Sequence, residues 1–112
     1  MAEKDFLREL RSFVMEHPQG WTHDEWLGFL YHLSKQGIST DDEDRIGAAL
    51  ERERLAHTLG KLTIKGLGPK RREALATRFG TLYRLMEASP EEIAEVPGVP
   101  RSLADQISEV LQ

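Results

Sequence analysis

The chain has 112 residues, of which 39% are hydrophobic, and its formal net charge is −4 at pH 7. This length allows one domain or two very small ones. The absence of cysteine excludes disulfides and thiolate metal sites. Because the sequence contains no long apolar run and no secretory signal pattern, we expect a cytoplasmic protein that does not enter a membrane.

The first half predicts three helices. Apolar residues recur at helical spacing from Phe6 to Val14, until His17-Pro18-Gln19-Gly20 ends the first helix. Thr22 and Glu25 form a capping box that starts the second, with Trp21 and Trp26 in the positions of a hydrophobic staple. We expect its buried face to comprise Trp26, Leu27, Phe29, Leu30 and Leu33, and its end to fall at Gly37.

A second capping box, from Thr40 to Glu43, predicts the start of the third helix. Its first turn is acidic, which suits the positive end of the helix dipole, and its inward side would carry Ile46, Ala49, Leu50 and Leu55. The predicted boundary follows at Leu59-Gly60-Lys61, so that residues 1–58 form an acidic three-helix module. We recognise no family in this module, and we name it as the candidate surface for a protein partner.

A glycine-hinged turn opens the second half. Gly66 suits the positive backbone dihedral of a tight turn, Gly68 leaves room for close approach, and Pro69 fits a first helical position. The amides that follow have no partner inside a helix and carry the positive end of its dipole, so they favour an anion. Three cations, Lys70, Arg71 and Arg72, strengthen that field.

The same unit recurs 32 positions later in a weaker form. This offset pairs Ile64 with Val96, Gly66 with Gly98, Leu67 with Val99, Glu73 with Asp105, Leu75 with Ile107 and Phe79 with Leu111. A fixed offset of this kind indicates one structural unit used twice.

These residues resemble the tandem helix-hairpin-helix domain, and residues 60–112 are most similar to the form found at the C-terminal end of the bacterial nucleotide-excision-repair endonuclease. The resemblance rests on the Gly66-Leu67-Gly68 hairpin, a helix from Pro69 to Phe79, a connector helix from Thr81 to about Glu87, and a second motif from near Ser89 with the hairpin Pro97-Gly98-Val99-Pro100. It implies that hairpin amides hold DNA phosphates on either side of the minor groove without reading sequence. The family role carries over to Gly66, Gly68, Lys70, Gly98 and Ser102. With the other hairpin residues and the nearby cations, the predicted DNA-binding residues are Lys65, Gly66, Leu67, Gly68, Lys70, Arg71, Arg72, Gly98, Val99, Arg101 and Ser102.

One departure weakens the second hairpin. Pro100 stands where the first hairpin has Gly68, so one amide donor is absent there, and Arg101 is the only nearby cation. We therefore expect the second site to bind phosphate less well than the first.

The charge distribution favours an anionic partner despite the negative total. Residues 1–60 carry 7 basic and 12 acidic side chains, whereas residues 61–112 carry 8 and 7. Residues 61–85 contain seven cations and a single acidic residue, Glu73. Because phosphate affinity depends on the local field, this segment is typical of a nucleic-acid contact, although a solvated basic helix face has the same composition.

Other chemistries find less support in the sequence. The cluster from Asp41 to Asp44 lacks the alternate spacing and interior glycine of a calcium loop, and the four histidines lack metal-ligand spacing. Trp21 and Trp26 fit a core role better than base stacking. Asp105 follows the second hairpin too closely for a glycosylase pocket, and the lysines that a lyase would need lie in the cationic segment. We expect no metal site, no catalytic residue, no cofactor and no enzyme activity.

The sequence thus predicts an all-α protein, a three-helix module (1–58) followed by a tandem helix-hairpin-helix domain (59–112). Its predicted function is sequence-independent DNA binding in repair or recombination, because no helix aims Asn, Gln and Arg at base edges. The alternative is a protein–protein interaction or dimerisation scaffold that uses the same domain, which exposed apolar residues on the second module would favour.

Overall fold

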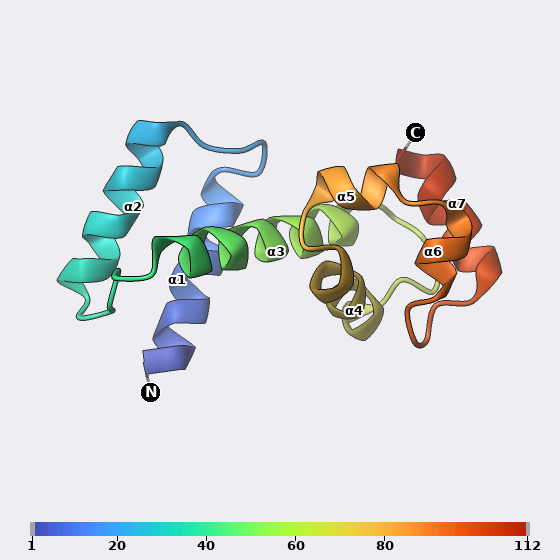
Figure 1. The fold of residues 1–112 in the computed structure, drawn as a ribbon, viewed down its shortest axis with the longest axis horizontal. Coiled ribbons are helices and arrows are strands. Elements are labelled where there is room, and N and C mark those ends of the chain that lie inside the picture. Colours follow the sequence, from blue (N-terminus) through green and yellow to red (C-terminus); the bar gives the residue numbers. More distant parts are fainter. Residues whose placement is uncertain (1, 112) are drawn as a thin grey trace.

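A computed structural model describes residues 2–111 as seven helices, with no strand among these residues, which confirms the predicted all-α class. None of the helices in this part of the chain is long and apolar enough to cross a membrane. In chain order (Figure 1) they are α1 (Ala2–Glu16), α2 (His23–Lys35), α3 (Glu43–Lys61), α4 (Pro69–Phe79), α5 (Leu82–Glu87), α6 (Pro90–Ala94) and α7 (Arg101–Leu111).

The start of α2 confirms the predicted capping box. The Thr22 hydroxyl accepts a hydrogen bond from the Glu25 amide at 3.1 Å, and the Thr22 amide donates to the Glu25 carboxylate at 2.8 Å. Leu27 was wrongly predicted to be buried, since 47% of it is exposed. It lies about 100° around the helix from Trp26, away from the face that enters the core.

The start of α3 corrects the predicted cap. Asp42, not Thr40, is the N-cap residue, and its carboxylate accepts a hydrogen bond from the Arg45 amide at 3.1 Å. A carboxylate is a stronger acceptor than a hydroxyl and suits the positive end of the helix dipole, so the helix begins after the acidic residue.

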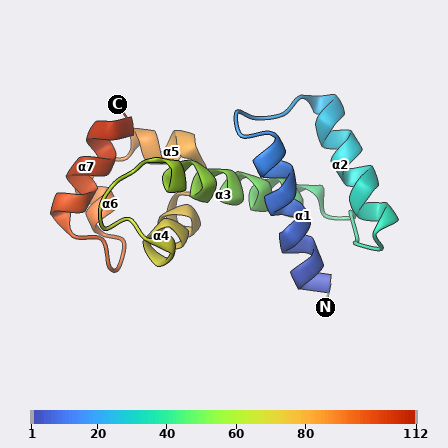
Figure 2. The ribbon, with the colours of Figure 1, turned by 180° about the vertical axis from the view of Figure 1, so that it is seen from behind.

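Two apolar cores share α3. The N-terminal core takes Ile46, Ala49 and Leu50 from this helix, whereas the C-terminal core takes Leu55 and Leu59. Figures 1 and 2 show α3 running from α1 and α2 at one end of the molecule to α4–α7 at the other, along a body of 45 × 28 × 22 Å. The packing divides between Leu50 and Leu55, several residues before the predicted boundary at residues 58 and 59.

Local signals place the remaining helices where the sequence predicts them. Gly80 ends α4 with a φ of +79°, and the hydroxyls of Thr81 and Ser89 cap α5 and α6. The two hairpin loops are therefore the segment between α3 and α4 and the segment between α6 and α7. Leu67 from the first loop and Val99 from the second are both buried in the C-terminal core.

Candidate nucleic-acid interface

The two hairpin turns have the same backbone geometry. Gly66 has a φ of +92° and Gly98 a φ of +87°, a region that glycine enters without steric cost. In the first turn the Leu67 amide donates to the Ile64 carbonyl at 3.2 Å. In the second, the Val99 amide donates to the Val96 carbonyl at 3.0 Å. The equivalence of residues 32 positions apart is therefore a structural repeat.

The helices that follow the turns also begin alike. The first intrahelical bonds run from the Arg72 amide to the Gly68 carbonyl and from the Ala104 amide to the Pro100 carbonyl, each at 3.0 Å. Several amides that precede these bonds in the chain form no backbone hydrogen bond within residues 2–111. They are the amides of Gly66, Gly68, Lys70 and Arg71 in the first hairpin and of Gly98, Arg101, Ser102 and Leu103 in the second. Unused amides at two helix starts are suited to binding anions.

Prolines remove amide donors from both hairpins, and more of them from the second. Each hairpin has one proline at its helix start, Pro69 in the first and Pro100 in the second, shifted by one position. The second hairpin also has Pro97 at the position of Lys65, whose amide forms no backbone hydrogen bond with another described residue. The second hairpin therefore offers one unused amide fewer than the first, and its weaker binding of phosphate stays a prediction.

The cations of the first hairpin have three different surroundings. Lys65 and Lys70 are exposed and form no ion pair or side-chain hydrogen bond with any other residue from 5 to 111. Lys70 is one of the residues that line a shallow hollow of about 540 Å³, together with Ile64, Gly66, Leu67, Gly68, Pro69 and Arg71. Arg72 instead lies against α3, where a methyl group added to Gly60 would come within 2.8 Å of its Nη1 atom.

The Arg71 side chain connects the two hairpins. Its Nε atom donates to the Gly98 carbonyl and its Nη1 atom to the Gly66 carbonyl, both at 2.6 Å. These are the carbonyls of the two equivalent turn glycines. Two of the five N–H donors of Arg71 are therefore used within the domain.

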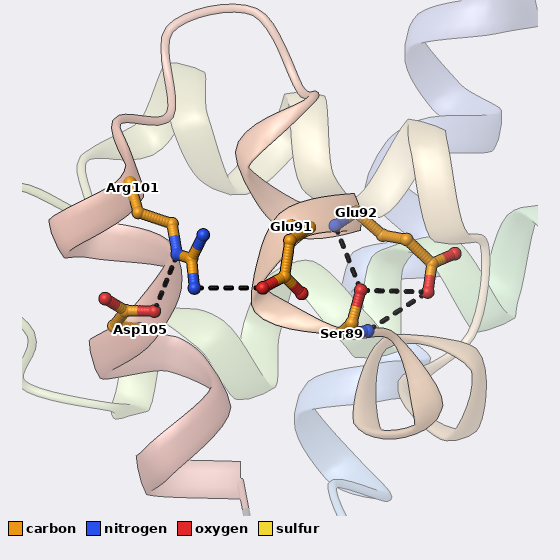
Figure 3. Close-up of polar contacts among 5 residues, drawn as sticks. All are labelled: Ser89, Glu91, Glu92, Arg101 and Asp105. Carbon is orange, nitrogen blue, oxygen red and sulfur yellow. Dashed lines mark hydrogen bonds and ion pairs between the residues drawn. The ribbon is translucent and has the colours of Figure 1, made fainter.

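Acidic side chains hold the cation of the second hairpin. Arg101 donates from Nε to Asp105 and from Nη2 to Glu91, each at 3.0 Å (Figure 3). The hydrogen bond and charge of Asp105, followed by the charge of Glu91, raise the pKa of Arg101. A backbone hydrogen bond and the charge of Arg101 lower the pKa of Glu91. These pairs reduce the positive field that Arg101 offers to a phosphate.

Ser89 and Glu92 form a separate cap next to this cluster. The Glu92 amide donates to the Ser89 hydroxyl at 3.2 Å, and the Ser89 amide donates to the Glu92 carboxylate at 3.1 Å (Figure 3). This capping box starts α6 and so fixes the approach to the second hairpin. Among the side chains that the structure describes, those of residues 5–111, no three His, Asp or Glu group as they would around a metal ion.

The second half of the chain matches a known protein family. Residues 59–112 match the family described as the SAM-like helix-hairpin-helix tandem. The tandem helix-hairpin-helix domain that the glycine turns predicted is thereby confirmed.

Several relatives of the chain are named UvrABC system protein C. The relative from Carboxydothermus hydrogenoformans is 36% identical over 74 residues, which cover 64% of this chain and 12% of the relative. The relative from Desulfatibacillum aliphaticivorans is 40% identical over 63% of this chain and 12% of its own length. The relative from Photobacterium profundum is 51% identical over 44% of this chain and 8% of its own length. The chain therefore spans about a tenth of these proteins. No solved structure matches it.

The likeness reaches beyond the tandem domain. The first alignment covers 64% of 112 residues, or about 72, whereas the family match covers residues 59–112. At least 18 aligned residues must therefore precede residue 59, and they include most of α3. This agrees with the burial of Leu55 and Leu59 in the C-terminal core.

Sequence reasoning identified the turns but not the partners of their arginines. The pairing of Arg101 with Asp105 had a visible signal, because opposite charges four residues apart on a helix are neighbours. The contact of Arg71 with Gly98 spans 27 residues and had no such signal. It depends on how the two hairpins pack together.

Proposed function

We propose that the tandem helix-hairpin-helix domain binds the sugar-phosphate backbone of DNA on the minor-groove side without sequence preference, in DNA repair or recombination. The observation that carries this proposal is the pair of equivalent turns, each with unused amides at a helix start. The similarity to proteins of the UvrABC system supports a role in repair.

The first hairpin is the stronger site in this proposal. Lys65 and Lys70 are exposed there without an acidic partner among residues 5–111, whereas Arg101 at the second hairpin is paired with two carboxylates. Gly66, Leu67 and Gly68 supply the backbone of the first site, and Gly98, Val99 and Ser102 that of the second. Arg72 contributes charge from its position beside Gly60.

Titration of labelled duplex, forked and single-stranded DNA at several salt concentrations tests the proposal. Two hairpins with a few cations neutralise on the order of two to four phosphates, so log affinity should fall with log salt at a slope of about −2 to −4. Scrambling the DNA sequence should change the affinity by less than about threefold, because phosphate contacts carry no base information. No binding at ~50 mM salt, or a flat salt response, would refute DNA binding.

A scaffold function is the second candidate, and exposed apolar side chains favour it. Tyr83 and Met86 on α5 are 72% and 45% exposed, and Val110 on α7 is 53% exposed. On the N-terminal module, Leu27 and Tyr31 are also exposed and one helical turn apart, which would suit a protein partner. Light scattering of the chain tests self-association, and a monomer at ~100 μM that binds DNA would favour the first function.

A further inference from the structure

Arg71 occupies a position that the repeat itself fills with an apolar residue. The 32-residue offset places Leu103 at the equivalent point of the second hairpin, where it is 4% exposed in the C-terminal core. The fold of the unit therefore does not require arginine at this position. In the first copy the side chain is half-buried and uses two donors on the Gly66 and Gly98 carbonyls.

The geometry of arginine suits this double contact. Its guanidinium is planar, always charged, and presents its N–H groups as a rigid fork, whereas lysine has a single compact head group. Hydrogen bonds from a charged donor are shorter and about twice as strong as neutral ones. The two bonds of 2.6 Å therefore fix the Gly66 and Gly98 turns relative to each other more firmly than apolar packing alone.

A fixed separation matters when two weak sites bind one ligand. Once the first hairpin holds a phosphate, binding by the second is intramolecular, and its benefit depends on how well the spacing matches the ligand. Ordering the hairpins beforehand also lowers the entropy lost on binding. A connection between the turns would thus raise affinity without touching the DNA.

We infer that Arg71 is a positioning residue that sets the spacing of the two hairpins, so that both engage one duplex at once. It acts through the Gly66 and Gly98 turns and is not itself a phosphate ligand. This inference rests on the proposed DNA-binding function, and it assigns Arg71 a different role from the exposed Lys70 on the same helix.

Two substitutions in the full chain separate positioning from charge. Arg71→Lys keeps the charge but replaces the two separate donor nitrogens of the fork by a single head group. Arg71→Leu introduces the residue that the second copy uses and should therefore preserve the fold. Both should lower the affinity for duplex DNA by a similar factor of about five to twenty, because the second hairpin no longer contributes in register. A direct phosphate ligand would instead lose little in the lysine variant.

A double-mutant cycle gives the readout that distinguishes the two roles. Ser102→Glu places a carboxylate in the first turn of α7, where the helix dipole tolerates it but a phosphate does not. In the Ser102→Glu protein, Arg71→Lys should lower the affinity for duplex DNA by less than about twofold, because the second hairpin no longer binds phosphate. The matched control, Lys70→Met, should lower the affinity for duplex DNA by the same factor with and without Ser102→Glu.

Amide NMR spectra of the free protein test the bridge without DNA. Arg71→Lys should shift the Gly98 and Val99 amide resonances, although these residues lie 27 and 28 positions away in sequence. If the wild-type chain binds no DNA, the proposed function fails and this inference with it. Two results would overturn only the positioning role, provided that the wild type binds DNA. The first is an Arg71→Lys protein that binds as tightly as the wild type. The second is an Arg71→Lys change that lowers the DNA affinity by the same factor with and without Ser102→Glu.

Discussion

Gly68→Val and Gly66→Ala should separate phosphate binding from folding within one hairpin. Gly68 has a φ of −82° and a ψ of 179°, and a side chain added there meets no atom within 4 Å. This extended conformation is also the one favoured before a proline such as Pro69. Valine fits it without strain, so the free energy of unfolding should change by less than about 1 kcal/mol, since lost unfolded-state entropy offsets a poorer N-cap.

Gly66 differs because its φ is +92°. An alanine there is forced into a region that disfavours L-residues, at a cost of about 1–2 kcal/mol in the free energy of unfolding. Thermal unfolding followed by circular dichroism should therefore rank Gly66→Ala as clearly less stable than Gly68→Val, although valine is the larger residue.

DNA binding should show the reverse order of severity for the folded proteins. The isopropyl group at residue 68 would stand beside the unused amides of Lys70 and Arg71 and block a phosphate from reaching them. A hydrogen bond to a charged group contributes about 1.5–3 kcal/mol, so the loss of one contact should weaken binding at least about tenfold. Fluorescence anisotropy with labelled duplex at ~50 mM salt measures this, with Thr77→Val on the exposed part of α4 as the matched control.

Two outcomes would refute this reasoning. Wild-type affinity in the folded Gly68→Val protein would show that the hairpin amides do not hold phosphate. Loss of the folded state in that variant would show that the space around residue 68 is not open.

Four further changes test other parts of the structure. Asp105→Asn removes the first acidic partner of Arg101 and should tighten DNA binding a few-fold at low salt, measured by the same anisotropy titration. Thr22→Ala should cost about 1 kcal/mol in the free energy of unfolding, measured by chemical denaturation. The hydrogen bond from the Thr22 amide lowers the pKa of Glu25 in the folded chain. The stability that this carboxylate adds is therefore fully present above the pKa that Glu25 has in the unfolded chain, and it is lost as the pH falls through the lower pKa of the folded chain. The difference in the free energy of unfolding between the wild type and Glu25→Ala should shrink over that pH range. Removing residues 1–58 should unfold what remains, measured by circular dichroism.

Features set by neighbouring residues could be predicted from the sequence. The Gly66 and Gly98 turns and the cap at Thr22 depend on residues within four positions, and the structure has all of them as predicted. The repeat was visible because each copy needs glycine at the same point of the turn. The DNA contacts assigned to these residues stay predictions.

Features that depend on packing between distant segments could not be predicted. The long side chains of Arg71, Arg72 and Arg101 were all predicted to be phosphate ligands. In the structure Arg71 donates to two carbonyls, Arg72 lies beside Gly60, and Arg101 pairs with two carboxylates. A flexible cation near a glycine turn can reach several acceptors. Only the tertiary arrangement of the hairpins decides which of them it meets.

The shared helix α3 decides where the chain can be cut. Residues 1–58 include Leu55, which is fully buried in the C-terminal core, so a fragment starting at residue 59 would lose that side chain and expose part of the surface that covered it. Loss of a buried leucine costs about 2–5 kcal/mol, which is most of the stability of a domain this small. A fragment of residues 43–112 keeps all of α3 and should fold, at the cost of exposing Ile46, Ala49 and Leu50. If residues 59–112 instead unfold as cooperatively and at the same temperature as residues 43–112, the second half of α3 is dispensable and the two cores divide at the helix end.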